Sequence, residues 1–453
     1  MEVIAAPATP PGESALGVVR LSGDGCLAAA GAFLRWESPP EPRRSCLVRA
    51  FGPDAEPLDR ALAVWFPGPA SYTGEDMLEI STHGSPFVLR RLLESAVAAG
   101  ARLARPGEFT LRAYLHGRLD LAQAEAVGAL IRARTDWAHR TALGQLDGRL
   151  SGEVRGQRER TLGALARVEA ALDHPDEDLP ALDGAVIAAE LDSLGDDARA
   201  LAGTHRAGRF AVDGARVVLV GRPNAGKSTL LNAWLGRDRA IVDALPGTTR
   251  DTLEEPADLD GLPAVLVDTA GLREAPDSPV EREGIARSRR ALEGADLAVL
   301  VVDRTRPLGS EELGLLARRG RLPVVVALNK SDLAGGVVGP DDLAGASAVE
   351  VCARSGDGLV RLATAVRGGL GAGAAGALAE GGTLVTLLRH RLALEEAAGE
   401  LARAADAARL ERLELSAAHL RGALAALGSI LGLEGDSSDE VLARIFADFC
   451  IGK

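Results

Sequence analysis

The amino-acid sequence predicts a multidomain chain of mixed α/β and all-α character. Short β-like runs separated by Pro and Gly turns fill residues 1 to about 116, which is typical of a compact α+β domain. Ala/Leu-rich helical periodicity then occurs twice, from Leu119 to about Gly203 and from Thr383 to Leu431. Between these two stretches, all-apolar strands alternate with helical segments, as in a buried, mostly parallel sheet. We therefore expect one discontinuous helical domain that is interrupted by an inserted α/β domain.

These changes divide the chain into four segments. The expected boundaries are 1–116 for the N-terminal α+β domain, 117–210 and 373–453 for the two parts of the helical domain, and 211–372 for the α/β domain. The Gly- and Ala-rich stretch from Arg367 to Gly376 is expected to close the α/β domain as a flexible linker. A chain of 453 residues is too long for one ordinary core, which agrees with several domains.

The individual elements follow from local pattern. In the N-terminal segment, short apolar runs predict strands at Val18–Leu21, Ala61–Phe66 and Met77–Ile80, and the stretch from Phe87 to Ala99 predicts a helix. The helical pattern after Leu119 is broken near His174 and Pro175. In the α/β segment, four entirely apolar runs predict buried parallel strands at Val217–Val220, Ala264–Val267, Leu297–Val302 and Val324–Leu328.

The bulk composition is typical of a soluble globular protein, with 47% hydrophobic and 25% charged residues. The N-terminus does not resemble a signal peptide, and no run approaches the length of a membrane span. The four cysteines have neither metal-ligand spacing nor the pattern of a disulfide framework. These features predict a cytoplasmic protein that does not bind membranes.

The net charge of −13 argues against nucleic-acid binding by the whole surface. Residues 101 to 140 hold seven arginines against four acids, a local excess of +3. Charge by itself favours a solvated helix face for this stretch, and a local nucleic-acid patch stays open as the alternative.

Lysine is scarce, and its few positions are informative. The chain has 51 basic residues, and only Lys227, Lys330 and Lys453 are lysines. Coding bias explains the scarcity, but a lysine should persist mainly where arginine's planar fork cannot replace a compact ammonium. Lys227 lies in a glycine-rich loop, Gly221–Ser228, which follows an apolar strand and opens a helix. That context is required of a phosphate-binding loop, in which backbone amides cradle phosphates, the lysine neutralises their oxygens and Ser228 holds Mg²⁺.

Further motifs follow in order, and those that begin at Asp268, Asn329 and Cys352 each end a predicted strand. Thr249, in the run Gly247–Asp251, is placed to complete the Mg²⁺ shell. Asp268 can reach the metal through water, while the Gly271 amide faces the γ-phosphate. The Asp332 carboxylate can accept from guanine's N1–H and exocyclic amine, which adenine cannot offer. Together these predict a GTP-binding domain whose ligand-contacting residues are Asn224, Ala225, Gly226, Lys227, Ser228, Thr229, Thr249, Asp268, Thr269, Ala270, Gly271, Asn329, Lys330, Ser331, Asp332, Cys352, Ala353 and Arg354.

Two details concern hydrolysis. Leu272 stands where many small GTPases have a water-orienting glutamine, so an acid from the following segment must serve, and Glu274, Glu281 and Glu283 are the candidates. Asn224, inside the loop, could coordinate a monovalent cation beside the phosphates and so supply the charge of an arginine finger. A plain loop-capping role for Asn224 is the alternative.

Motifs along the whole chain are similar to those of the MnmE (TrmE) family of bacterial tRNA-modification GTPases, within the TrmE-Era-EngA-like superfamily. The motifs that carry this resemblance are Ala8–Gly12 with Arg20–Gly23, Tyr72–Asp76, His83–Gly84, Arg105–Thr110, Gly117–Ala126 and the tail Phe449–Lys453. The resemblance implies a folate-binding, dimerising N-terminal domain, a discontinuous helical domain that ends in the tail, and an inserted GTPase domain with potassium-dependent hydrolysis. It also implies a homodimer that joins the flavoprotein MnmG in a heterotetramer and modifies wobble uridines of tRNA with a tetrahydrofolate one-carbon unit.

Site residues carried over by this resemblance fall into three groups. The folate-contacting positions are Arg20, Glu79, Arg118 and Lys453. The potassium-binding positions are Asn224, Asp243, Leu245 and Thr248, within a loop that also includes Ala244, Pro246 and Gly247 beside the nucleotide. Glu281 matches the acid that orients the hydrolytic water, which with Lys227 makes up the expected catalytic pair.

Cys450 is a further candidate nucleophile, because a thiolate could attack a one-carbon carrier or a pyrimidine. A small buried anchor for the tail is the alternative for this residue. At the level of the whole protein, the alternative function is a ribosome-assembly GTPase switch without modification chemistry. That class shares the nucleotide motifs, but this chain has one set of them and no KH-type RNA-binding loop.

Overall fold

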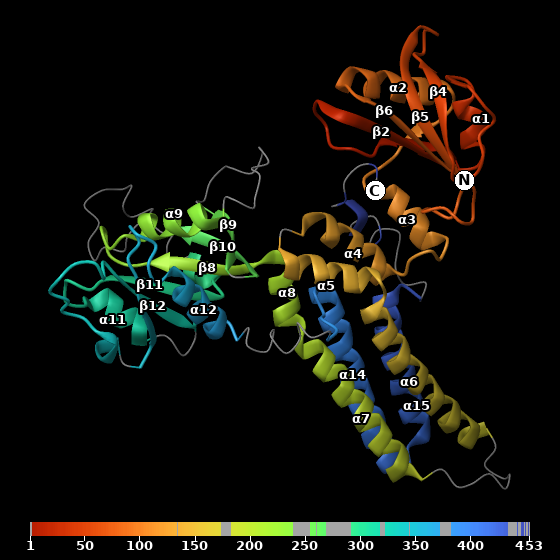
Figure 1. Ribbon diagram of the computed structural model, residues 1–453. Helices are drawn as coiled ribbons and strands as arrows, with labels where there is room; N and C mark the ends of the chain where they lie inside the picture. Colours follow the sequence, from red (N-terminus) through yellow and green to blue (C-terminus); the bar gives the residue numbers. More distant parts are fainter. Residues whose placement is uncertain are drawn as a thin grey trace, which may run out of the picture. The chain divides into compact units, whose positions relative to one another are not determined.

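The computed structural model describes residues 2–133, 135–173, 183–238, 254–259, 261–268, 291–317, 322–343, 345–371 and 382–433, and near the C-terminus residues 442, 445–447, 449 and 452. The chain forms two compact units (Figure 1). The first contains residues 1–128, 145–191 and 400–453, and the second contains residues 129–144 and 192–399. The four-domain division expected from sequence stays a prediction.

The N-terminal part of the first unit is a seven-stranded sheet. Its strand order is β3 (Leu34–Trp36), β4 (Ser45–Phe51), β5 (Pro57–Phe66), β6 (Met77–Gly84), β2 (Ser14–Ser22), β1 (Ile4–Pro7) and β7 (Arg102–Leu103), antiparallel except where β1 pairs with β7. Helices α1 (Cys26–Ala30) and α2 (Pro86–Ala98) contribute buried residues to one core with the sheet, among them Leu89 and Leu92. Helix α3 (Glu108–Leu115) follows β7.

The opposite face of this sheet carries exposed apolar side chains. Leu16 on β2, Leu47 on β4 and Leu62 on β5 are 64%, 40% and 48% exposed. Leu47 lies opposite Leu62 in the β4–β5 register, and both alternate with buried neighbours along their strands. This alternation shows that the part of the sheet around these leucines is packed on one side only.

The helices between and after the sheets have the expected Ala/Leu-rich stripes. They are α4 (Leu121–Arg132), α5 (Asp136–Leu146), α6 (Arg149–Asp173), α7 (Gly184–Gly203), α8 (His205–Asp213), α14 (Leu388–Arg409) and α15 (Leu413–Leu431). Within the first unit α15 packs along α6. None of the described helices is long and apolar enough to cross a bilayer.

The second unit contains a six-stranded sheet ordered β13 (Ser347–Glu350), β12 (Val324–Asn329), β11 (Leu297–Asp303), β8 (Ala215–Val220), β10 (Leu262–Asp268) and β9 (Glu254–Leu259). All pairs are parallel except β9 with β10. Apolar residues on the two faces of β8, β11 and β12 belong to two different core clusters, as a doubly covered parallel sheet requires. Helices α9 (Lys227–Asp238), α11 (Ser310–Ala317) and α12 (Leu359–Gly369) and the 3₁₀ turn η1 (Pro340–Leu343) connect the strands.

The predicted fold class is confirmed, with two local differences. The expected linker from Arg367 begins inside α12, because Val366 and Leu370 are buried against the sheet core and hold the last helical turn. The helix expected from Thr383 begins at Leu388 instead, because Leu384, Val385 and Thr386 are buried in an irregular segment before it.

Candidate functional site

The carboxyl edge of the parallel sheet brings the predicted nucleotide motifs together. The glycine-rich loop leaves the end of β8, Asp268 and Asn329 end β10 and β12, and Cys352 follows β13. Asp303 ends β11 in register with Asn329. Ligands of open α/β sheets bind at this edge, outside the strand ends.

The loop after β8 has the backbone of a tight cradle. Gly221 and Gly226 have φ of 149° and 101°, and Asn224 has φ of 62°. Asparagine is one of the few residues with a side chain that tolerate the left-handed region. A Cβ atom at Gly226 would lie 2.2 Å from Nδ2 of Asn329, so the loop passes directly over that amide.

Asn329 ties the loop to the segment after β13. Its Nδ2 donates to the Ala225 carbonyl at 2.8 Å, and its Oδ1 accepts from the Ala353 amide at 3.0 Å. The side chain is buried, with 3% of the residue exposed. The phosphate loop and the segment that contains Cys352, Ala353 and Arg354 are thus held as one body.

Lys227 and Ser228 lie at the N-terminal end of α9. The Lys227 ammonium is buried and donates to the carbonyls of Gly221 and Arg222 at 2.9 and 3.1 Å. Burial lowers the pKa of Lys227, against an opposing effect from the negative charge of Asp268. Among the described residues the Lys227 ammonium donates its hydrogen bonds to carbonyl groups, so it is suited to gain anionic oxygens.

The Ser228 hydroxyl donates to Oδ2 of Asp268 at 2.8 Å. The other carboxylate oxygen of Asp268, Oδ1, is buried and has no hydrogen-bond partner among the residues that the structure describes. A hydroxyl and a carboxylate are oxygen ligands of the kind that Mg²⁺ takes, directly or through water. This pair therefore fits the predicted metal position.

The guanine-recognition segment is supported by Asp303 at the end of β11, a residue that sequence reasoning missed. Lys330, with φ of 65°, places Nζ 2.5 Å from Oδ2 of Asp303. Oδ1 of Asp303 accepts from the amide and hydroxyl of Thr305 at 3.0 and 2.7 Å. Burial would raise the pKa of Asp303, but hydrogen bonds from Lys330 and Thr305 lower it below its usual value. Asp332 and Arg354 are exposed, and the Ser331 amide donates to the Val351 carbonyl.

A second predicted site lies in the first unit. Arg20 on β2 faces Glu79 on β6 in register, and its Nε and NH2 donate to Oε1 of Glu79 at 3.0 and 2.6 Å. The same guanidinium lies 5.7 Å from the centroids of the Tyr72 and Phe109 rings. Its NH1 donates to the carbonyl of Gly452 at 3.1 Å, which brings the C-terminal tail to this residue.

The tail contact is close. Gly452 has φ of 97°, and a Cβ atom there would lie 2.1 Å from the Pro7 carbonyl oxygen. Arg118 is exposed, and no side-chain hydrogen bond or ion pair joins it to another described residue. The structure therefore gathers Arg20, Glu79 and the tail, whereas Arg118 is not joined to them.

A buried polar network lies next to this site. Most of its residues belong to the sequence motifs, but the sequence alone assigned them no role. Arg112 donates to Glu75 Oε2 at 2.8 Å, and their side chains are 5% and 4% exposed. Ser22 Oγ donates to the same carboxylate at 3.0 Å and lies 2.7 Å from Thr73 Oγ1. Glu108 lies 2.6 Å from Arg102 and 3.4 Å from Arg112. Three motifs distant in sequence are joined here.

Several predicted site residues lie outside the described part of the chain. They are Asp243, Ala244, Leu245, Pro246, Gly247, Thr248, Thr249, Thr269, Ala270, Gly271, Glu281, Cys450 and Lys453.

Comparison with known proteins finds similarity along the full length. The family model described as the GTP-binding protein TrmE N-terminus matches residues 3–118, and the MnmE helical domain matches residues 121–450. The protein named tRNA modification GTPase MnmE from Aquifex aeolicus (strain VF5) is 40% identical over 454 residues, with 100% of both chains covered. Those of the same name from Chloroflexus aurantiacus and Thermus thermophilus are 45% and 44% identical, covering 100% and 99% of each chain.

Proposed function

Because the chain belongs to the MnmE family of tRNA modification GTPases, as its motifs predicted, we propose a complete reaction for it. It hydrolyses GTP in a potassium-dependent step. With the flavoprotein MnmG, it installs the 5-carboxymethylaminomethyl or 5-aminomethyl group on wobble uridines of certain tRNAs. A tetrahydrofolate derivative, in the 5-formyl or 5,10-methylene form, donates the one-carbon unit. The link that Asn329 makes between the phosphate loop and Ala353 is the observation that carries the nucleotide part.

The chain's own residues define the nucleotide chemistry. Loop amides and the Lys227 ammonium would hold the β- and γ-phosphates, while Asp332 accepts from the guanine edge. Mg²⁺, held by Ser228 and Thr249 with Asp268 in the outer shell, would neutralise developing charge on the phosphates. Glu281 would orient the attacking water. Asp303 would keep the Lys330 stem in place beside the base, since its carboxylate is itself fixed by Thr305.

Potassium is proposed to sit beside Asn224, with Asp243, Leu245 and Thr248 as its other ligands. Asn224 is exposed in the left-handed conformation, and its side chain makes no hydrogen bond with another described residue. That state fits a side-chain oxygen kept available for a ligand better than a loop-capping role.

We expect GTP turnover in sodium to be at least about tenfold slower than in potassium, because the smaller ion would not supply charge at the same place. The measurement is steady-state phosphate release in matched KCl and NaCl buffers. The Asn224→Ala variant should be slow in both salts. Equal rates for the unaltered protein in the two salts would remove the cation role of Asn224.

The folate site is proposed at Arg20 and Glu79, with Arg118 and Lys453 as further contacts. Support comes from the guanidinium of Arg20, which lies 5.7 Å from the centroids of two aromatic rings and also donates to the tail carbonyl. A flat heterocycle and a glutamate-bearing tail are suited to aromatic faces and fixed charges of this kind. Cys450, which belongs to this tail in sequence, stays a candidate nucleophile.

The assembly is proposed to be a homodimer that joins MnmG in a heterotetramer. The open face of the N-terminal sheet, with Leu16, Leu47 and Leu62, offers an apolar surface that a second copy would cover. The acidic net charge of −13 implies that MnmG supplies much of the tRNA contact. We place the protein in the cytoplasm, without membrane binding. Full-length similarity to tRNA modification GTPases speaks against the ribosome-assembly alternative.

The proposal predicts that a strain lacking this protein loses the 5-aminomethyl family of wobble-uridine modifications. Mass spectrometry of nucleosides from purified tRNA measures this loss. Complementation with the unaltered gene should restore the modification, whereas Gly452→Ala should restore it poorly, because a Cβ atom there would collide with the Pro7 carbonyl. Unchanged wobble uridines in the deletion strain would refute the tRNA function, and full rescue by Gly452→Ala would refute the tail's part in it.

A further inference from the structure

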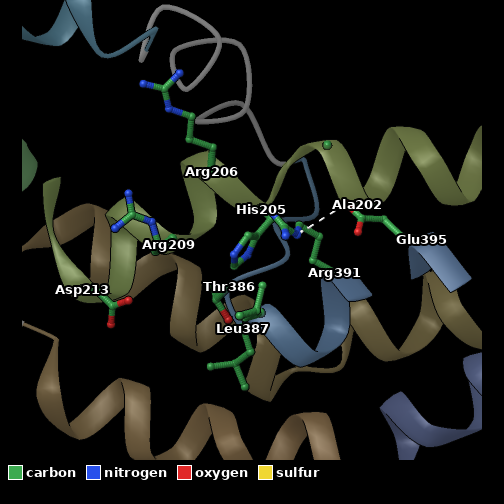
Figure 2. A pocket seen from close by; sticks show the side chains of 11 residues that line it. Ala202, His205, Arg206, Arg209, Asp213, Thr386, Leu387, Arg391 and Glu395 are labelled. Carbon is green, nitrogen blue, oxygen red and sulfur yellow. Dashed lines mark ion pairs between the residues drawn. The ribbon is translucent and has the colours of Figure 1, made fainter. Parts of the chain in front are cut away.

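A pocket in the second unit is separate from the nucleotide motifs. Its volume is about 590 Å³, which lies within the range of ordinary small-molecule sites. It lies among the end of α7, helix α8 and the start of α14, as Figure 2 shows. The proposed function assigns no role to any residue that lines it.

The pocket is rich in cationic groups. Arg206 and Arg209 line it from α8, and Arg391 lines it from α14. Figure 2 shows the Arg206 side chain directed away from those of His205 and Arg391. Arg209 is also paired with Asp296, and Arg391 lies 3.5 Å from Glu395 in a half-exposed pair within its own helix. Arg206 has no carboxylate partner among the described residues, and its guanidinium lies 5.7 Å from the Phe210 ring centroid. Arg206 is therefore the guanidinium without a carboxylate partner, and an anion would compete with Glu395 for Arg391, while Asp213 also lies at the pocket.

The backbone adds to this field. Both α8 and α14 begin at the pocket, and neither has an acidic residue in its first turn. The first amides of a helix have no partner within the helix. They therefore create a positive potential at its N-terminus, which favours anions. The carboxyl end of α7 lies at the same cavity and contributes the opposite potential, so the two amino ends favour a phosphate group only together with the arginines.

His205 supplies a ring nitrogen that can form a further hydrogen bond. It is buried, with 7% exposed, and its Nδ1 lies 3.3 Å from the Val385 carbonyl. If Nδ1 carries the proton for that contact, Nε2 is left as a hydrogen-bond acceptor. Nε2 has no hydrogen-bond partner among the residues that the structure describes, although His205 lines the pocket. Such an atom can accept from a hydroxyl of a ligand or, when protonated, donate to a phosphate oxygen.

The pocket walls are fixed before any ligand arrives. The Val385 amide donates to Thr204 Oγ1 at 3.0 Å, and Gly208 approaches Val385 so closely that a Cβ atom there would lie 2.1 Å from its carbonyl oxygen. Leu387, Leu388 and Ala202 give an apolar side to the same cavity. Fixed walls reduce the ordering cost of binding, and the volume exceeds what a bare phosphate needs.

We propose that this pocket binds the phosphate group of a nucleotide, with Arg391 contacting the phosphate, the Arg206 side chain turning in from the rim to join it, and the apolar side facing the nucleoside. The nucleotide is either a free mononucleotide or part of an RNA strand. This site is independent of the GTP site, because its residues lie on different helices from α9 and the loop before it.

The test uses the full chain saturated with GDP, so that the guanine site is occupied. Isothermal titration calorimetry with AMP, whose adenine the guanine site rejects, should give a single additional site. Arg391→Gln and Arg206→Gln should each weaken AMP binding by about tenfold or more, because each removes a charge-assisted contact. Arg403→Gln is the matched control: it also lies on α14 and is also paired with a glutamate, Glu400, but it is not part of the pocket.

A short RNA without a terminal phosphate distinguishes the two sources. Competition between this RNA and AMP supports a phosphate within RNA, and AMP binding without competition supports a free nucleotide. No heat with either probe overturns the proposal, as does AMP binding that is equal in the two pocket variants and the control. GTP hydrolysis by each variant, measured in parallel, keeps this outcome separate from that of the proposed GTPase reaction.

Discussion

We expect Asn329→Ala to lower the affinity of the protein for GDP and GTP by at least about 100-fold. The side chain makes two buried hydrogen bonds, one to the Ala225 carbonyl and one to the Ala353 amide. Removing it leaves both backbone groups without that partner, and each buried unsatisfied group costs about 1–3 kcal/mol. The loss falls on both the phosphate loop and the segment beside the base, so the two halves of the site no longer hold one geometry.

Equilibrium titration with a fluorescent GDP analogue measures this loss, with ATP-analogue binding as a second readout of base selectivity. Asn232→Ala is the matched control, because Asn232 is an exposed asparagine on α9 in the same unit. Its affinity should match that of the unaltered protein, since exposed substitutions away from special features usually have small effects. Affinity lowered less than about tenfold in Asn329→Ala would show that the two backbone groups find other partners.

Much of the nucleotide site could be predicted because the ends of buried strands can be located in the sequence. The apolar runs before Asp268 and Asn329 mark buried parallel strands, and parallel strands bring their carboxyl ends to one edge. Asp303 ends a strand of the same kind, but no motif accompanies it, so its contact with Lys330 emerged only in three dimensions. A pairing partner on a neighbouring strand has no fixed spacing in sequence.

The two edge strands of the α/β sheet lack the apolar runs that predict its buried strands. β9 contains Glu254, Glu255 and Pro256, and it is an antiparallel edge strand. Edge strands tolerate proline and charge, so they lack the apolar signal of buried strands. β13, at the other edge, is expected only from the motif Cys352–Arg354 that follows it, since it is four residues long and has only partly buried or exposed residues. Tertiary pairing, and not local pattern, makes these segments strands.

The pocket among α7, α8 and α14 illustrates a different limit. His205, Arg206 and Arg391 are ordinary residues of amphipathic helices when seen in sequence, and 185 positions separate Arg206 from Arg391. Their meeting depends on the return of the chain after the α/β sheet, where Val385 contacts Thr204. Composition shows only that arginine is abundant.

The largest stability effect is expected at the buried pair of Glu75 and Arg112. Replacing Glu75 with alanine removes the 2.8 Å partner of Arg112, whose remaining carboxylate contact, to Glu108, is 3.4 Å long. Breaking a buried ion pair from one side typically costs about 3–5 kcal/mol, because the remaining charge is buried without compensation. Ser22 Oγ would lose its contact with the same carboxylate. We therefore expect the N-terminal sheet to be strongly destabilised in Glu75→Ala.

Hydrogen–deuterium exchange of peptides from β2 and β6 measures this local stability, whereas a single melting temperature would mix the domains of the chain. Exchange there should accelerate by about two orders of magnitude or more, since about 1.4 kcal/mol corresponds to tenfold. The double variant Glu75→Leu with Arg112→Met should recover much of the loss, because an apolar pair leaves no buried charge. Arg44→Ala, which breaks the exposed pair with Glu41, should leave exchange unchanged. If the double variant is as unstable as Glu75→Ala, the packing and hydroxyl contacts around Ser22 and Thr73, and not the uncompensated charge, set the stability of this core.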